Sequence, residues 1–420
     1  MQGRNAFAPY QFFLTLMGCL MPVTVCWYLA SADPLFKVKS VEFTHPDVVV
    51  IVVVMVAFAR ALVKGFDPLP RPLLITLLLF LGSTLLSSVV AEDKLRALSA
   101  VIQIFEFGML LWAFSAVTEA RYFRRIVHFI LAVFVFQTLV AVGQFLGGVP
   151  TPKGTFYHHQ EYAMLTTAAT AIALALFAGE RVGWKRFLYF VTLLILLVGS
   201  LLGQERAPWA SFLVVGVVVV AYAGKRKKAV LIGFAATVLA GVLLVVSIPD
   251  LREATLSRMA EAQASTESEN SLLGRLLIWG IAFKLFLEHP ILGVGPKNFV
   301  TMVPHLASTE EMMGNKAVDP HNAFVEYLAE QGIIGFLTYV AFCIAIVRLG
   351  LKPLRQKLSA LHRSLCLTYL AYNVYWLLML YSYFSKEMAH VHFMIVGLMV
   401  GLQRSFSQLP GPSTRVSAEA

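Results

Sequence analysis

The chain has 420 residues, of which 58% are hydrophobic and only 14% are charged. A soluble domain typically carries about 25% charged residues, so this composition excludes an ordinary water-soluble protein. The net charge of +10 does not indicate nucleic-acid binding, because the basic residues stand in short blocks between apolar runs. Apolar runs of about 20 residues cross a bilayer as helices, so we predict an all-α, polytopic membrane protein.

Apolar runs recur along the whole chain and predict about twelve transmembrane helices in a single domain, residues 1–420. The runs lie at residues 8–31, 46–63, 72–91, 97–118, 126–147, 161–179, 187–203, 209–224, 229–248, 322–347, 364–384 and 389–403. The first run ends near a possible signal-peptidase site, but it is longer than the usual core of about 7–15 residues. We therefore expect an uncleaved first span.

Blocks of Lys and Arg mark alternate connections between the runs. They include residues 60–71, 121–125, 181–186, 225–228 and 348–363. Because positively charged short loops stay in the cytoplasm, both termini and the tail at 404–420 are predicted to be cytoplasmic. Residues 248–321 then form one long loop on the opposite, outward face.

The long outward loop is predicted to contain helices. Leu272 to His289 has apolar residues at helical spacing among scattered charges, which indicates an amphipathic helix on the membrane surface or over a cavity. Pro290 to Asn298 is a Gly/Pro turn that ends this helix, and we expect the polar segment from Ser308 to Val318 to be mobile. The four cysteines lie inside apolar runs without metal-ligand spacing, so neither a disulfide nor a zinc site is expected.

Several residues that can take part in catalysis or anion binding are predicted to lie on the outward face. Taken alone, Arg206 is typical of an interfacial cation and Arg275 of a solvated charge on a helix face, and Lys153 is ambiguous. The roles of His158 and His159 stay open. A cluster of such cations above a membrane cavity would suit an anionic lipid headgroup such as a pyrophosphate. His321 is either an interfacial histidine or a general base.

A polar stripe begins next to His321. Asn322, Glu326 and Glu330 are spaced four residues apart and therefore lie on one face of the predicted helix. Carboxylates inside a membrane span are costly, so the stripe is predicted to face a wet cavity, with interhelical contacts as the alternative.

At these residues the chain resembles O-antigen ligases. His321-Asn322, followed by nine residues and then Gly332-Ile333-Ile334-Gly335, fits their pattern H-[NSQ]-x9-G-x-x-[GTY]. The segments at 274–279 and 290–299, and Lys153 to Phe156, resemble further parts of the same superfamily. The segment around Arg206 departs from it, because Glu205 stands where a small or hydroxyl residue is usual.

The resemblance implies a metal-independent, inverting glycosyltransferase of the GT-C type without a cofactor. Such a ligase transfers a glycan from undecaprenyl pyrophosphate to a sugar hydroxyl of lipid A–core, at the periplasmic face of the bacterial inner membrane. His321 would be the base, and Arg206, Arg275 and Lys153 would hold the pyrophosphate. Two alternatives share this donor: an O-antigen polymerase and a protein O-oligosaccharyltransferase. A lipid or solute transporter is the alternative from another class, although the sequence shows no matching halves.

Overall fold

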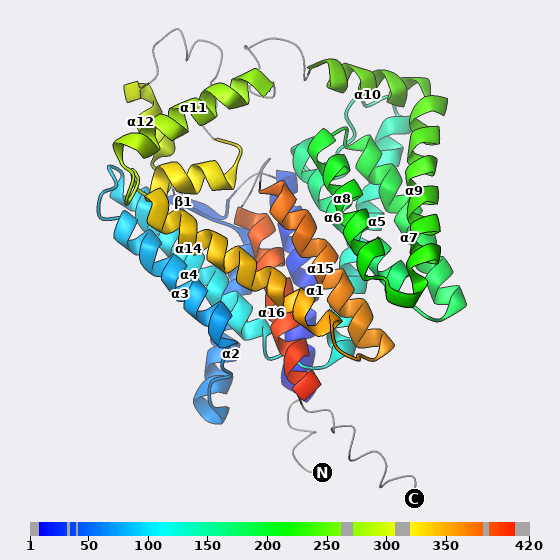
Figure 1. The fold of residues 1–420 in the computed structure, drawn as a ribbon, viewed down its shortest axis with the longest axis horizontal. Coiled ribbons are helices and arrows are strands. Elements are labelled where there is room, and N and C mark those ends of the chain that lie inside the picture. The colour runs from blue at the N-terminus through cyan, green and yellow to red at the C-terminus, as the bar shows by residue number, and fades with distance from the viewer. Residues whose placement is uncertain are drawn as a thin grey trace, which may run out of the picture.

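The computed structural model describes residues 8–31, 34–38, 41–261, 272–306, 320–380 and 386–407. Within these ranges the chain folds into a bundle of helices (Figure 1). The one element of another kind is an antiparallel hairpin of β1 (Phe36–Val38) and β2 (Val41–Phe43), which the sequence analysis did not predict. The segment predicted to be mobile, 308–318, and most of the predicted tail lie outside the described residues.

Each of the twelve apolar runs contains one helix of the bundle. They are α1 (Ala8–Ser31), α2 (His45–Lys64), α3 (Arg71–Ser87), α4 (Lys94–Phe114), α5 (Ala120–Leu146), α6 (His159–Gly179), α7 (Gly183–Leu202), α8 (Arg206–Tyr222), α9 (Lys227–Ser247), α14 (Ala323–Leu354), α15 (Ala360–Met379) and α16 (Lys386–Ser407). Short connections join most of them, such as the 3-10 turn η1 (Gly224–Arg226).

Among the described helices, eight are long and apolar enough to cross a membrane by themselves: α1, α2, α4, α5, α6, α7, α9 and α14. Helices α3 and α8 are apolar but have 17 residues each, and α15 and α16 carry more polar side chains. The protein is therefore a polytopic membrane protein, as predicted, and the number of twelve spans stays a prediction.

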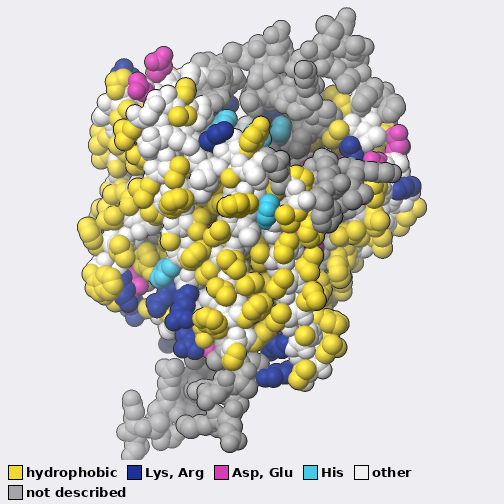
Figure 2. Space-filling model, turned by 180° about the vertical axis from the view of Figure 1, so that it is seen from behind, with side chains coloured by type: hydrophobic (Ala, Val, Ile, Leu, Met, Phe, Trp, Pro, Cys, Tyr) yellow, Lys and Arg dark blue, Asp and Glu magenta, His cyan; other side chains and the backbone are white. Residues whose placement is uncertain are grey.

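The surface of the bundle is apolar around its middle (Figure 2). Large side chains in the middle of helices, such as Met55, Leu139 and Val217, are more than half exposed. In water such a surface would be a large unfavourable patch, whereas bilayer hydrocarbon is its natural solvent. Helix α6 is the opposite case, because nearly all of its side chains are buried inside the bundle, where it packs against α7, α8 and α15.

Between α9 and α14 the described residues form three further helices: α10 (Pro249–Glu261), α11 (Leu272–Glu288) and α12 (Phe299–Leu306). They occupy the end of the bundle away from the start of α1 and the end of α16, which we call the loop end (Figure 1). Helix α11 packs on α14 and shares with it and with α12 a second small core, formed by Ile278, Ala282, Leu285, Val294, Phe299, Val303 and Ala329. The predicted loop helix is therefore present, and it covers the beginning of α14.

Candidate functional site

Helix α14 is interrupted at Gly332, whose φ of 62° and ψ of −164° are not helical. The loop that follows α11, residues 289–298, enters this interruption and replaces missing helical hydrogen bonds. Three backbone bonds join the two segments: Val294 N to Ala329 O (3.2 Å), Gly295 N to Glu330 O (2.8 Å) and Ile333 N to Pro290 O (2.9 Å). The break in α14 is therefore a docking place for the loop.

Glycine is required on both sides of this junction. A Cβ atom on Gly332 would lie 2.4 Å from the Ile291 carbonyl oxygen, and one on Gly293 would lie 2.3 Å from the Glu330 carbonyl carbon. Both glycines also have positive φ angles, which side chains disfavour. Gly332, the first glycine of the motif that the sequence analysis recognised, is therefore required by the close approach of two backbones.

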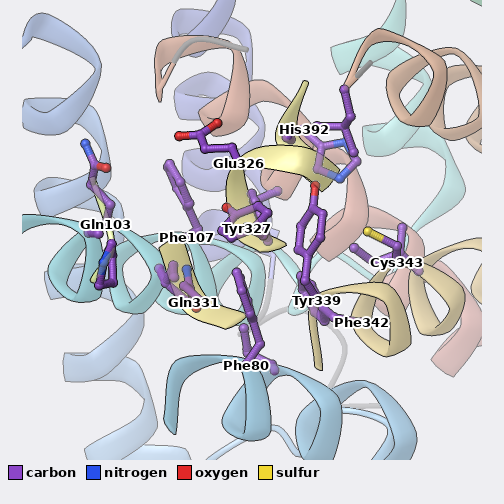
Figure 3. Close-up of a pocket in the computed structure, with 18 of the residues that line it drawn as sticks. Phe80, Gln103, Phe107, Glu326, Tyr327, Gln331, Tyr339, Phe342, Cys343 and His392 are labelled. Atoms are coloured by element: carbon purple, nitrogen blue, oxygen red, sulfur yellow. The ribbon is translucent and has the colours of Figure 1, made fainter. Parts of the chain in front are cut away.

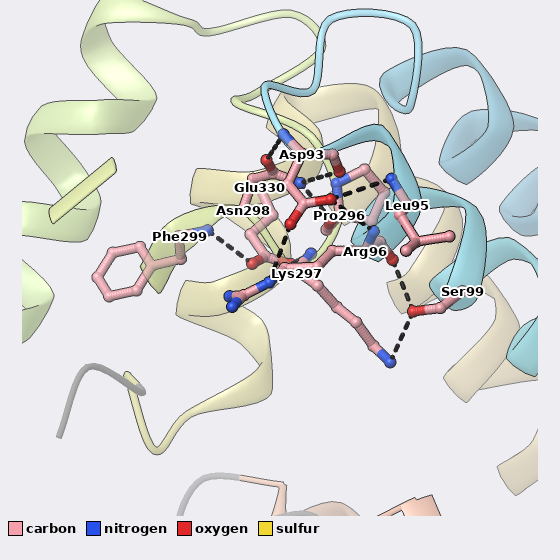
Figure 4. A network of polar contacts seen from close by, with 9 residues as sticks. All are labelled: Asp93, Leu95, Arg96, Ser99, Pro296, Lys297, Asn298, Phe299 and Glu330. Carbon is pink, nitrogen blue, oxygen red and sulfur yellow. Dashed lines mark hydrogen bonds and ion pairs between the residues drawn. The ribbon is translucent and has the colours of Figure 1, made fainter. Parts of the chain in front are cut away.

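A polar network fixes the same loop to neighbouring helices (Figure 4). The buried Glu330 carboxylate accepts hydrogen bonds from the backbone N–H groups of Lys297 (2.6 Å) and Phe299 (3.0 Å). The Asn298 side chain accepts from Asp93 N (2.7 Å), just before α4 begins. Negative charge at the start of α12 is favourable because it opposes the positive end of the helix dipole. Glu330, which the sequence placed on a polar stripe, therefore anchors the loop.

His321 lies at the turn into α14 with a φ of 48°, in the left-handed region that residues other than glycine seldom adopt. The residues on both sides of it are held. Trp279 of α11 donates its indole N–H to Pro320 O (2.9 Å), and Ala323 N donates to Leu380 O at the end of α15 (2.8 Å). His321 itself is partly buried. The backbone of the histidine is therefore fixed between α11 and α15.

Asn322 follows as the N-cap of α14. Its side-chain oxygen accepts from the N–H groups of Phe324 (3.0 Å) and Val325 (3.3 Å), which have no partner inside the helix. Glu326, one turn later, lines a cavity, as predicted. Asn322 does not line this cavity, because its side chain caps the helix.

Arg275 lies on α11, four residues before Trp279 and therefore on the same side of that helix. Since Trp279 contacts Pro320, this side faces the His321 turn, and Arg275 is partly buried. The structure thus brings Arg275 and His321 to one region, although they are 46 positions apart in the sequence.

Arg206 is the first residue of α8, and Lys153 lies in the loop before α6. The two segments are joined by Gln204, whose side chain donates to Pro150 O (2.9 Å). Glu205, which departs from the family pattern, pairs with His159 (3.1 Å).

The Lys153 ammonium group donates to Tyr157 O (2.8 Å) in its own loop and lies 5.5 Å from the Tyr157 ring centroid. This contact is exposed, so it holds the group only weakly. Lys153 is therefore near Arg206 through a shared loop contact, and it has a local partner in this state.

The predicted base, His321, and the three residues predicted to bind pyrophosphate all lie at the loop end of the bundle. Successive helices alternate in direction, so α6, α8 and α14 begin at this end and α15 ends there (Figure 1). Helix α15 packs against both α8 and α14. The end of α15 therefore lies between two groups of predicted site residues. Arg206 and Lys153 are on one side, and Arg275 and His321 are on the other.

A cavity of about 270 Å³ lies among α3, α4, α14, α15 and α16, with Ala323 in its wall (Figure 3). Its lining from the first part of α14 is polar or amphipathic: Glu326, Tyr327, Glu330 and Gln331. Its lining from the second part is more apolar: Tyr339, Phe342, Cys343 and Ile346. Lys297 also lines it and donates to Ser99 (3.3 Å). The sequence analysis did not select Lys297, which lies inside the Gly/Pro turn and has no distinctive spacing to any other site residue.

The fold and this arrangement define a polytopic membrane protein with basic residues and a histidine gathered at one end, beside a cavity lined by polar and aromatic side chains. Residues 191–340 match the family model described as O-antigen ligase. This match over residues 191–340 confirms the predicted resemblance to O-antigen ligases, a family of glycan-transferring enzymes. The match includes Arg206, Arg275 and His321, and Lys153 precedes it. No curated protein matches the chain.

Proposed function

We propose that this protein is an O-antigen ligase that transfers a glycan from undecaprenyl pyrophosphate to a sugar hydroxyl of lipid A–core. The family match supports glycan transfer from a lipid-linked donor. The observation that carries the proposal is the His321 turn, where a histidine in a left-handed backbone is held from both sides beside a cavity. Unfavourable backbone conformations persist where the surrounding structure enforces them, and they concentrate at functional sites.

His321 acts in this proposal as the general base. The acceptor hydroxyl is weakly acidic, so attack on the anomeric carbon is faster when a base removes its proton as the new bond forms. Imidazole exchanges protons near neutral pH, and it is small enough to approach a sugar hydroxyl. A base must be positioned before it is useful, and the two backbone contacts beside His321 supply that positioning.

The guanidinium groups of Arg206 and Arg275 stabilise the pyrophosphate that leaves. Negative charge grows on the leaving oxygen during the reaction, and donors already in place lower the free energy of that state. Guanidinium is suited to this role because its fork of N–H groups matches phosphate oxygens. Lys153 adds a third cation once its ammonium group exchanges the exposed Tyr157 carbonyl for phosphate. A pyrophosphate stabilised in this way leaves without a general acid, and in-line attack inverts the anomeric centre.

The cavity beside Ala323 receives part of a substrate next to His321. Its wall changes from carboxylate and amide groups in the first part of α14 to aromatic and aliphatic groups in the second part. Such a gradient suits an amphiphile, with polar atoms near Glu326 and apolar atoms farther along α14. Glu326 in this proposal accepts hydrogen bonds from sugar hydroxyls.

The proposed topology has twelve spans, cytoplasmic termini and the loop end in the periplasm. The alternating direction of the twelve helices supports it, as does the placement of the Lys and Arg blocks at residues 121–125, 181–186 and 225–228 opposite the loop end. Under this topology the catalytic residues face the periplasm of the bacterial inner membrane.

A reconstituted transfer assay with acceptor competition tests the proposal. Purified protein in vesicles receives lipid-linked glycan together with both lipid A–core and a second lipid-linked glycan. Product on lipid A–core supports the ligase. Longer lipid-linked chains would identify a polymerase instead, and glycan attached to protein would identify an oligosaccharyltransferase. Movement of the substrate across the membrane without a new bond would identify a transporter.

The substitution His321→Asn tests the base. Asparagine tolerates the left-handed backbone better than alanine does, so the change removes the base with little added strain. We expect transfer to fall at least a hundredfold while thermal unfolding stays unchanged. His289→Ala is the matched control, because His289 is an exposed histidine of the same loop. Wild-type transfer by His321→Asn would remove the assignment.

A further inference from the structure

Three ionisable side chains from distant parts of the chain meet inside the bundle, away from the residues proposed for transfer. Asp47 belongs to the first turn of α2, Glu106 to the middle of α4 and His390 to the first turns of α16. His390 Nε2 lies 2.9 Å from Glu106 Oε1 and 3.4 Å from Asp47 Oδ1. One ligand atom from each residue lies within 4.8 Å of the other two.

The cluster is shielded from water. His390 is fully buried, and the Asp47 and Glu106 side chains are 5% and 18% exposed. Phe107 packs the edge of its ring against the His390 ring, with 5.3 Å between centroids, and Phe393 stacks on Phe107. In such surroundings an uncompensated charge is costly, by several kcal/mol or more.

The three side chains are of the kinds that bind transition metals. Imidazole nitrogen and carboxylate oxygen are both common ligands of Zn²⁺. Here one imidazole and two carboxylates converge on one point from three helices.

Other contacts orient the ligands. The second carboxylate oxygen of Asp47, Oδ2, accepts hydrogen bonds from the backbone N–H (2.6 Å) and the hydroxyl (2.9 Å) of Thr44. These bonds leave Oδ1 directed toward His390. Metal ligands are commonly held in this manner by hydrogen bonds to their remaining atoms.

We propose that Asp47, Glu106 and His390 form a site for one divalent transition-metal cation of the Zn²⁺ class. Zn²⁺ binds imidazole nitrogen and carboxylate oxygen at about 2.0–2.2 Å, which places neighbouring ligand atoms of a tetrahedron about 3.4 Å apart. The separation between His390 Nε2 and Asp47 Oδ1, 3.4 Å, equals this value. The separation between His390 Nε2 and Glu106 Oε1 is 2.9 Å, a hydrogen bond that the cation would replace by moving the two atoms about 0.5 Å apart. One imidazole and two carboxylates supply three ligands, and a water molecule completes the set.

The cation joins α2, α4 and α16 and has no part in transfer. Helix α16 also carries His392 and Phe393, which line the cavity, so the site steadies one cavity wall. The proposal differs from the sequence-based expectation of a protein without bound metal. That expectation considered spacing among Cys and His residues, whereas these three ligands come from residues 47, 106 and 390 and have no common spacing.

Zinc content and thermal unfolding of the purified full-length protein test the proposal. The protein is stripped with a chelator, incubated with ZnCl₂ and desalted, and its metal is then quantified by mass spectrometry. We expect about one zinc per chain and a Tm higher by several degrees, because a cation that binds only the folded state stabilises it. Co²⁺ in place of Zn²⁺ should give visible absorption typical of tetrahedral coordination.

The substitutions His390→Gln and Glu106→Gln should each lower zinc affinity at least tenfold and remove the rise in Tm. His128→Gln is the matched control, because His128 is a membrane histidine that contacts Tyr189 (2.7 Å) and lies outside the cluster. Absence of zinc binding by the wild-type protein would overturn the proposal. Equal zinc binding by wild type and both cluster variants would overturn it as well, as adventitious metal.

Discussion

Adding one methyl group at Gly332, in the junction between α14 and the loop after α11, should lower the stability of the protein strongly. The residue has a φ of 62° and a ψ of −164°, a conformation that is almost restricted to glycine and costs other residues about 1–3 kcal/mol. The added Cβ would also lie 2.4 Å from the Ile291 carbonyl oxygen and 2.8 Å from Gly293 N, both of them backbone atoms. Such overpacking costs about 1–3 kcal/mol more.

We therefore expect Gly332→Ala to destabilise the protein by about 2–6 kcal/mol. Because the entropy of unfolding is about 2.1 cal/mol/K per residue, thermal unfolding in detergent should show a Tm lower by about 2–7 °C. Transfer activity should fall by more than the unfolded fraction explains, because the loop also positions α12 and the beginning of α14 beside His321.

Gly280→Ala is the matched control for this experiment. Gly280 lies on α11 with no atom within 4 Å of an added Cβ and with an ordinary helical backbone. Alanine favours a helix over glycine by about 0.8–1.0 kcal/mol, so this variant should be as stable as wild type or slightly more stable. A Gly332→Ala protein with wild-type Tm and activity would refute the close approach of the two backbones.

Three further substitutions have defined outcomes. Asn322→Ala removes the N-cap of α14 and should cost about 1 kcal/mol in thermal unfolding, while Asn322→Ser keeps most of that stability; equal loss in both would contradict the capping role. Glu330→Gln leaves one oxygen for two backbone N–H donors and should cost about 2–3 kcal/mol, measured in the same way, whereas an unchanged Tm would show that the carboxylate does not anchor the loop. Arg275→Ala should raise the KM for the pyrophosphate donor more than tenfold with Arg275→Lys in between, and an unchanged donor dependence would argue against phosphate binding.

The sequence by itself determined the class of the protein and the positions of its helices. Bilayer hydrocarbon requires long apolar runs whose backbone groups bond within each helix, so hydropathy alone locates such helices. The helix at Leu272–Glu288 could also be predicted, because its apolar residues recur at helical spacing. The boundaries differ by several residues in places. Helix α14 continues to Leu354, beyond the predicted end at 347, since basic side chains near a helix end are compatible with helix at the membrane surface.

The roles of the polar stripe could be assigned only from the tertiary structure. Asn322, Glu326 and Glu330 share one helix face in the sequence, yet Asn322 caps the helix, Glu326 lines the cavity and Glu330 holds the loop. Helical spacing gives the direction of a side chain relative to its own helix and does not reveal which segment lies opposite.

Contacts between distant segments explain what the sequence left undecided. The break at Gly332 arises from a loop that leaves α11 about 40 residues earlier, and the cluster at Asp47 and His390 joins the two ends of the chain. The histidine motif could be recognised from its spacing, whereas the reason for that spacing required the structure. A histidine held at a helix start, a cap beside it and a glycine where another backbone enters the helix are consequences of packing.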